Sequence, residues 1–275
     1  MIGRIQRIWS NLIQIAVKNR PVSPVKMGEK ILLLLSAPCT QAYFDSEEVR
    51  RQFAEYDLAI VNNMLVYSER EMHIWHPKYV IIFDPVFYND DISYSDKRNN
   101  FLQAVERIDW ECYIVTSSLA KFRIKNENVK FIYISPFSIK KYSNLKIGFL
   151  KKNIVNLGCN SVIQGALYFA ITFLYKEIAI LGCTYKGYDV EMKQDGLHLD
   201  GYSHYYDGQI DHEIIANEQL EQMSMGFLTD YYYRSYLSSM IFHNIKKYAN
   251  KMGVIITNYS EGNKIDAFVT KELRK

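Results

Sequence analysis

The sequence lacks a long, uninterrupted apolar run. Its best candidates, Ile31–Leu35 and the run that follows Ser161, are too short or too interrupted to cross a bilayer. The amino terminus also lacks the compact apolar core followed by small residues that marks a secretory signal. We therefore expect a cytoplasmic protein without a membrane-spanning helix.

Paired cysteines are absent as well. The four cysteines, Cys39, Cys112, Cys159 and Cys183, lie far apart, and no C-x-x-C pair occurs. This spacing argues against a zinc site and, in a chain without a secretory signal, against a disulfide framework.

Several nucleotide-binding motifs are missing too. No Gly-rich fingerprint follows the first predicted strand, and no G-x-x-x-x-G-K-[ST] occurs. The second predicted strand ends in Asn62-Asn63, where a dinucleotide-binding fold has an acidic residue for the ribose. No clear D-x-D metal motif is present, and we expect Asp207 and Asp211 to be solvated loop residues rather than cation ligands. The sequence therefore predicts neither a resident cofactor nor a metal site.

What the chain does contain is enough apolar sequence for one large core. It has 275 residues, of which 48% are hydrophobic, which suits one domain with an excursion. We predict an amphipathic helix and linker over residues 1–28 and a single domain over residues 29–275. Residues 187–230, which are polar and rich in tyrosine, are expected to form a lid insertion.

Short apolar segments alternate with amphipathic ones from Lys30 onward, which is typical of a mostly parallel sheet covered by helices on both faces. The predicted fold class is therefore α/β and Rossmann-like, with the lid after the sixth strand. Strands are expected at Ile31–Leu35, Leu58–Val61, Tyr79–Phe83, Cys112–Thr116, Lys130–Ile134, Glu177–Leu181 and Val254–Asn258. Helices are expected at Ser46–Tyr56, Asp96–Ile108, Ser161–Tyr175, Tyr231–Met252 and Lys264–Arg274.

The helix predicted after Ser161 is apolar around most of its circumference, so we expect it to be buried. Asn160 and Ser161 carry side-chain oxygens suited to capping its first turn. The unpaired N–H groups and positive dipole end of that turn favour an anion. A capped core helix without a ligand is the alternative.

Charge is distributed unevenly along the chain. Residues 121–152 carry nine lysine and arginine side chains against Glu127, whereas residues 189–230 carry ten acidic side chains against Lys193. A basic segment leading into an anion-binding helix, followed by an acidic loop, fits a small negatively charged ligand better than a nucleic acid. Solvated surface charge is the alternative for the lysines.

The first twenty residues have apolar side chains at helical spacing, with Arg4, Arg7, Lys18 and Arg20 on the remaining face. A basic amphipathic helix that contains Trp9 suits peripheral contact with an anionic membrane. The same helix would equally suit packing against the domain or against a second subunit in a homo-oligomer.

Four places along the chain carry a family resemblance. They are the turn at Pro38, the asparagines Asn62 and Asn63, the pair Asn160-Ser161, and the run from Tyr175 to Gly182. With Ser203-His204-Tyr205 in the loop that follows, the chain resembles the bacterial sialyltransferases of glycosyltransferase family 42 and the related motility-associated factors that handle nonulosonic acids. The resemblance spans roughly residues 30–258.

The resemblance implies a CMP-activated acidic sugar as donor and a glycan hydroxyl as acceptor, without a further cofactor, in bacterial surface polysaccharide synthesis. Donor-binding residues would be Ser36, Pro38, Asn62, Asn63, Asn160, Ser161 and Gly182. The chain departs from the family where Ser36-Ala37-Pro38 replaces a Gly-rich turn and where Thr184 replaces an aspartate.

Sugar transfer from a nucleotide monophosphate needs a stabilised leaving phosphate and a base for the acceptor hydroxyl. Tyr185 and Tyr188 suit the first task, because a neutral phenol donates a hydrogen bond without titrating near pH 7. The family's catalytic histidine is replaced by residues of the segment 206–208, so His204 is the first candidate for the base and His212 the second.

Two other classes of function stay open. The motility-factor branch also resembles pterin pyrophosphokinases, so a phosphotransferase that holds Mg²⁺ on carboxylates is one alternative. A non-catalytic interaction protein that acts through its basic amino-terminal helix is the other.

Overall fold

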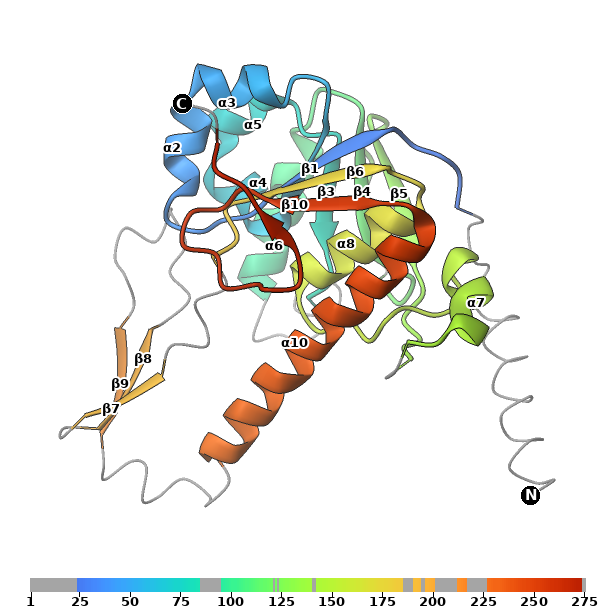
Figure 1. The fold of residues 1–275 in the computed structure, drawn as a ribbon. Coiled ribbons are helices and arrows are strands. Elements are labelled where there is room, and N and C mark those ends of the chain that lie inside the picture. Colours follow the sequence, from blue (N-terminus) through green and yellow to red (C-terminus); the bar gives the residue numbers. More distant parts are fainter. Residues whose placement is uncertain are drawn as a thin grey trace.

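The computed structural model describes residues 24–84, 95–120, 122, 124–139, 142–184, 190–193, 196–200, 212–216 and 227–273. A central sheet runs through the molecule, with the long helix α10 and helix α8 on one face and the helices from α2 to α6 on the other (Figure 1). The predicted amino-terminal helix lies outside the described residues. No helix within them is both long and apolar enough to span a membrane.

The elements follow one another in the order expected for an α/β chain. The strands of the main sheet are β1 Lys30–Leu34, β2 Asp57–Val61, β3 Tyr79–Ile82, β4 Cys112–Ser117, β5 Val129–Ile134, β6 Glu177–Leu181, β10 Ile255–Asn258 and β11 Val269–Thr270. The helices are α2 Thr40–Asp45, α3 Glu47–Gln52, α4 Asn62–Tyr67, α5 Glu69–Trp75, α6 Ser95–Glu106, the 3₁₀ turn η3 Asn144–Lys146, α7 Ile147–Lys151, α8 Val162–Thr172 and α10 Phe227–Met252.

All eight strands of the main sheet pair in parallel, in the order β11-β10-β6-β1-β2-β3-β4-β5. Parallel neighbours need a crossover, and helices supply most of these connections, on both sides of the sheet. The predicted Rossmann-like α/β fold is confirmed.

Strand β1 shows why both faces are covered. Ile31 and Leu33 join the core beneath α8 and α10, whereas Leu32 and Leu34 join the core beneath α2, α3, α4 and α6. Successive side chains of a strand point to opposite faces, so an unbroken apolar run requires apolar partners on both. All four side chains are at most 1% exposed.

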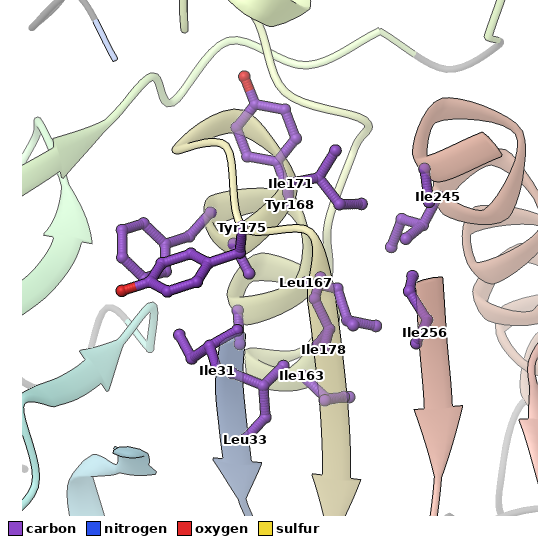
Figure 2. Packing of buried hydrophobic residues seen from close by; sticks show 14 of the residues in the cluster. Ile31, Leu33, Ile163, Leu167, Tyr168, Ile171, Tyr175, Ile178, Ile245 and Ile256 are labelled. Atoms are coloured by element: carbon purple, nitrogen blue, oxygen red, sulfur yellow. The ribbon is translucent and has the colours of Figure 1, made fainter. Parts of the chain in front are cut away.

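Helix α8 is buried around its whole circumference in the core that contains Ile31 and Leu33. Its residues from Ile163 to Thr172 are all buried. Figure 2 shows Ile163, Leu167 and Ile171 of α8 in the same apolar cluster as Ile31 and Leu33 of β1. Helix α8 packs against β1 and β3. The prediction of a buried helix after Ser161 is confirmed, and the helix ends at Thr172, before the predicted Tyr175.

One sequence prediction about helices is wrong. Residues 264–273 do not form a helix: Val269 pairs with Thr257 and adds the short edge strand β11. Asn62 and Asn63 follow the second strand as expected, and they are the first residues of α4. At β11, pairing with the sheet overrides a weak local pattern.

The amino ends of the strands carry a polar cluster made of Asp57, Lys78, Tyr79 and Tyr175. The Tyr175 hydroxyl donates to Asp57 Oδ2 at 2.5 Å, and Lys78 Nζ reaches the same oxygen at 2.8 Å. The hydroxyls of Tyr79 and Tyr175 lie 2.7 Å apart. Burial, followed by the hydrogen bond to Asp57, raises the pKa of Tyr175 well above its ordinary value. These contacts hold together the amino ends of β2, β3 and β6.

An insertion separates β6 from α10. It contains three antiparallel strands, β7 Val190–Lys193, β8 Gly196–Asp200 and β9 His212–Ala216, which form a separate small sheet (Figure 1). This sheet falls within residues 187–230. Its function as a lid stays a prediction, as does the division of the chain at residue 28.

Candidate functional site

The carboxyl edge of the parallel sheet contains a topological switch point. The chain builds β1 to β5 in one direction across the sheet and then returns to place β6 on the other side of β1. The connections on either side of that point leave in opposite directions, and ligands of open α/β sheets bind in the crevice that results. The loops after β1 and β6 are therefore the natural place for a ligand.

These two loops are hydrogen-bonded to each other. The Leu35 N–H donates to Leu181 O at 2.9 Å, and the Ala37 N–H donates to Gly182 O at 3.0 Å. Ser36 is buried within this turn. The structure thus brings the predicted donor-binding residues Ser36, Pro38 and Gly182 into one local region.

Gly182 has a close backbone approach that only glycine permits. Its φ is +66°, and a Cβ atom there would lie 2.2 Å from Leu35 O and 2.3 Å from Thr40 Oγ1. The Thr40 hydroxyl itself donates to Leu35 O at 2.6 Å. The glycine bend predicted from the sequence is therefore needed to seat β6 against the turn after β1.

The first turn of α8 contains an unpaired buried oxygen. Ser161 is the N-cap residue, with extended backbone angles of φ −137° and ψ 156°, but its side chain accepts no capping hydrogen bond. Its Oγ is buried and has no hydrogen-bond partner among the described residues. The predicted cap is therefore wrong for Ser161. Buried polar groups are nearly always hydrogen-bonded, so this hydroxyl makes the start of α8 a candidate position for a water, an ion or a ligand.

The residues around Ser161 are held firmly. The exposed residue Asn160 donates its N–H to Gln164 Oε1 at 3.0 Å. Gln164 Nε2 donates in turn to Ser238 Oγ and Ser238 O, at 2.8 and 3.1 Å. Gln164 is fully buried, so this network ties the start of α8 to α10 and fixes the direction of the turn.

A cavity of about 200 Å³ opens next to this turn, at the carboxyl ends of β3, β4 and β5. Apolar side chains, including those of Phe83, Leu119 and Tyr168, form much of its wall. Its polar groups come from Ser117, Ser135, Asn156 and Cys159. The cavity therefore lies on the same edge of the sheet as the switch point, but farther along it.

Gly165 shapes this cavity. A Cβ atom at Gly165 would lie 2.4 Å from two carbons of the Phe83 ring. Both residues line the cavity. The absence of a side chain on α8 at this position lets the Phe83 ring pack directly against the helix, where it forms a wall of the cavity.

The ionisable groups in the cavity wall are neutral near pH 7. Burial raises the pKa of the Cys159 thiol to about 12. Burial also raises the pKa of Tyr168 well above its ordinary value, and the single hydroxyl hydrogen of Tyr168 is shared between Val155 O at 2.7 Å and Leu150 O at 3.0 Å. The wall thus offers neutral hydrogen-bonding groups.

Only some of the remaining predicted site residues lie in the part of the chain that the structure describes. Asn62 and Asn63 follow β2, the neighbour of β1, and so lie on the same edge of the sheet. Tyr185, Tyr188 and His204 lie outside the described residues. His212 is the first residue of β9, and nothing is described of its side chain. The proposed catalytic set therefore stays a prediction.

Sequence reasoning did not select the cavity residues. Ser117 and Ser135 end or follow β4 and β5, and that position was their only signal. Asn156 lies in an irregular segment. Its side chain donates to Ser135 O at 2.8 Å and accepts from the Gly158 N–H at 2.7 Å. No sequence pattern marks such a contact. Within the described ranges, no group of three or more His, Cys, Asp or Glu side chains is placed to hold a metal ion.

Comparison with known proteins supports the fold. No protein-family model matches the chain, and no curated protein matches its sequence. A solved structure of similar fold is a MAf glycosyltransferase from Magnetospirillum magneticum AMB-1, with a TM-score of 0.51 and 10% sequence identity. The match covers 90% of this chain but only 35% of that protein. The chain thus shares its α/β fold with part of a glycosyltransferase of the motility-factor type.

Proposed function

We propose that the chain is a glycosyltransferase that moves an acidic sugar of the nonulosonic type from a CMP-activated donor to a glycan hydroxyl. The observation that carries the proposal is the buried, unpaired Oγ of Ser161 at the start of α8. It lies at the edge of the sheet where α/β folds bind ligands. The likeness in fold to the MAf glycosyltransferase supports the same class.

The donor fits the groups at this edge. The N–H groups of the first α8 turn and the positive end of the helix dipole favour a phosphate or a carboxylate. The Ser161 hydroxyl is able to donate one hydrogen bond and to accept two, so it suits an anionic oxygen. In this proposal Ser36, Pro38, Asn62, Asn63, Asn160 and Gly182 form the rest of the donor site.

The reaction requires one proton transfer and one bond exchange. A base removes the proton of the acceptor hydroxyl, the acceptor oxygen bonds to the anomeric carbon, and the bond from that carbon to the phosphate oxygen breaks. CMP leaves with the bonding electron pair. We assign the base to His204, with His212 as the second candidate, and leaving-group stabilisation to Tyr185 and Tyr188. We propose metal independence because the sequence contains no clear D-x-D motif.

Release of CMP from purified protein tests the proposal. The donors are CMP-sialic acid and related CMP-nonulosonates, each assayed with and without EDTA. We expect release that persists in EDTA and falls by roughly 10²–10⁴ in His204→Ala, with donor binding nearly intact. Absence of both binding and turnover across the panel contradicts the proposal. Activity that EDTA abolishes would favour a phosphotransferase, and an unchanged rate in His204→Ala would transfer the base to His212.

Membrane association is a separate part of the proposal. The basic amphipathic segment 1–20 would hold the enzyme at the inner face of the cytoplasmic membrane, near a growing surface glycan. Flotation with anionic liposomes, with and without this segment, tests the point. Equal flotation of the two proteins removes the membrane role and leaves packing against the domain or a second subunit.

A further inference from the structure

We infer that the cavity at the carboxyl ends of β3, β4 and β5 is the acceptor subsite and binds a neutral sugar ring. The inference rests on the proposed glycosyl transfer, and it assigns to the acceptor a place separate from the donor site. Its volume of about 200 Å³ is sufficient for one ring but not for a nucleotide together with a sugar.

The chemistry of the wall selects an uncharged occupant. None of the described residues that line the cavity carries a charged side chain. An ion placed there would lose its hydration without gaining a counter-charge, at a cost of several kcal/mol. The described wall therefore favours an uncharged occupant over a phosphate or a carboxylate, whereas the first turn of α8 nearby would accept an anion.

The wall also has unused hydrogen-bonding capacity. Ser117 Oγ accepts from the Leu119 N–H at 3.2 Å, which leaves its own O–H to donate. The side chain of Asn156 uses one amide hydrogen for Ser135 O and one oxygen lone pair for the Gly158 N–H, which leaves a second of each. With the ring of Phe83 as an apolar wall, the cavity offers a flat apolar surface and donor and acceptor groups at its edge. Sugar rings present the same combination, an apolar face bordered by hydroxyls.

The position along the sheet favours the acceptor over the nucleobase. The switch point adjoins β1, and the cavity is centred near β4, three strand spacings of about 4.8 Å away, or roughly 14 Å. A phosphate bound at the loops after β1 and β6 is separated from its nucleobase by a single ribose, which is too short for that span. For a phosphate at the first turn of α8, which adjoins the cavity, competition by cytidine decides between nucleobase and acceptor. A phosphate at the switch point, the transferred sugar beside it and an acceptor ring next in line would cover the distance.

Gly165 provides a sharp variant. In Gly165→Ala the new methyl group meets the Phe83 ring, which must shift, and because both residues line the cavity we expect its shape to change. The matched control is Gly148→Ala in α7, where a Cβ atom has no neighbour within 4 Å. Ser117→Ala is a second variant, which removes a hydroxyl from the wall without adding volume.

Ligand-observed saturation-transfer NMR with a panel of neutral methyl pyranosides tests the inference without requiring turnover. We expect at least one pyranoside to bind, with an affinity that changes little between low salt and about 0.5 M salt. Binding should weaken about tenfold in Gly165→Ala and several-fold in Ser117→Ala, and stay unchanged in Gly148→Ala. CMP should not compete. If no pyranoside binds, or if all variants bind equally, the inference is wrong.

Two further outcomes separate this inference from the proposed function. Cytidine that binds in place of the pyranosides, and is lost in Gly165→Ala, would assign the cavity to the nucleobase and overturn the inference while sparing the transferase. Pyranoside binding that persists in a protein unable to bind or turn over any CMP-sugar would overturn the transferase and the acceptor role with it, but not the sugar-binding cavity.

Discussion

The two ends of the parallel sheet are built differently. At the amino end, Asp57, Lys78, Tyr79 and Tyr175 all find partners within the chain. At the carboxyl end, the buried Oγ of Ser161 has none among the described residues, and a cavity lies beside it. A satisfied polar network adds rigidity, whereas an unsatisfied buried group costs stability that a ligand can restore. The amino end therefore serves stability, and the carboxyl end is where binding is expected.

At the carboxyl end of the sheet, we expect a substitution of Gly182 to cause the largest loss of stability, because Gly182 contacts the turn after β1. Gly182→Ala forces a methyl group against the Leu35 carbonyl in a left-handed backbone, and we expect it to lower the free energy of unfolding by about 3–5 kcal/mol. Gly253→Ala has the same φ of +66° but nothing within 4 Å, so it should cost only about 1 kcal/mol. Urea unfolding measures both. Equal losses would show that backbone strain alone accounts for the requirement for glycine.

Two buried thiols allow the ends to be compared by pH. Cys112 begins β4 at the amino end and Cys183 follows β6 at the carboxyl end, and burial raises the pKa of each from 9.0 to about 12. Above pH 9 the unfolded chain releases these protons while the folded chain keeps them, so stability falls as pH rises toward 12. We expect a loss of about 3 kcal/mol between pH 8 and pH 10 from the two thiols together.

The slope of stability against pH, rather than its level, is the informative quantity here. Burial raises the pKa of Cys159 in the same way, so Cys112→Ala and Cys183→Ala should each remove about a third of the contribution of the three thiols, whatever cavity they leave. A slope that is unchanged in Cys183→Ala alone would show that the carboxyl end already admits solvent in the folded protein.

The amino end of the sheet can be tested by replacing a tyrosine with phenylalanine at two positions, the buried Tyr175 and the partly exposed Tyr113. Each hydroxyl donates to a carboxylate, Tyr175 to Asp57 at 2.5 Å and Tyr113 to Glu111 at 2.7 Å, but only the first is buried. Tyr175→Phe should cost about 2 kcal/mol, because it leaves polar partners unpaired, and Tyr113→Phe less than about 0.5 kcal/mol. Thermal or urea unfolding decides between them, and donor binding should change in neither. Similar losses would mean that the buried network adds nothing.

Ser161 should give the smallest change in stability. Ser161→Ala removes an oxygen that has no described partner, so the free energy of unfolding should stay the same or rise by up to about 1 kcal/mol. Ser46→Ala removes a hydroxyl that accepts from the Val49 N–H at 3.3 Å and should cost about 1 kcal/mol. Calorimetric binding of CMP should weaken in Ser161→Ala only. A destabilised Ser161→Ala protein would show that the oxygen has a partner in the folded chain.

The sheet could be predicted from the sequence because its signal is local. Unbroken apolar runs such as Ile31–Leu35 require burial on both faces, and that requirement fixes the fold class before any contact is known. The small edge strand β11 carried no such run and was mistaken for a helix. Its assignment depends on Thr257, a residue distant in sequence.

The site could be predicted from the sequence only where the residue type itself indicates the backbone conformation. Gly182 and the start of α8 were identified because glycine and small polar residues mark turns and helix starts. The cavity was missed because it depends on Gly165 meeting Phe83, two residues 82 positions apart whose contact no periodic pattern records. Ser161 was placed correctly at the N-cap of α8, but its side chain makes no capping hydrogen bond.

Strand β1 belongs to both hydrophobic cores, with Ile31 and Leu33 in one and Leu32 and Leu34 in the other. Neither half of the molecule can therefore melt without exposing residues that the other half needs. The amides of β1 and its neighbour β6 should be the last in the chain to exchange with deuterium, and their exchange should report global rather than local opening.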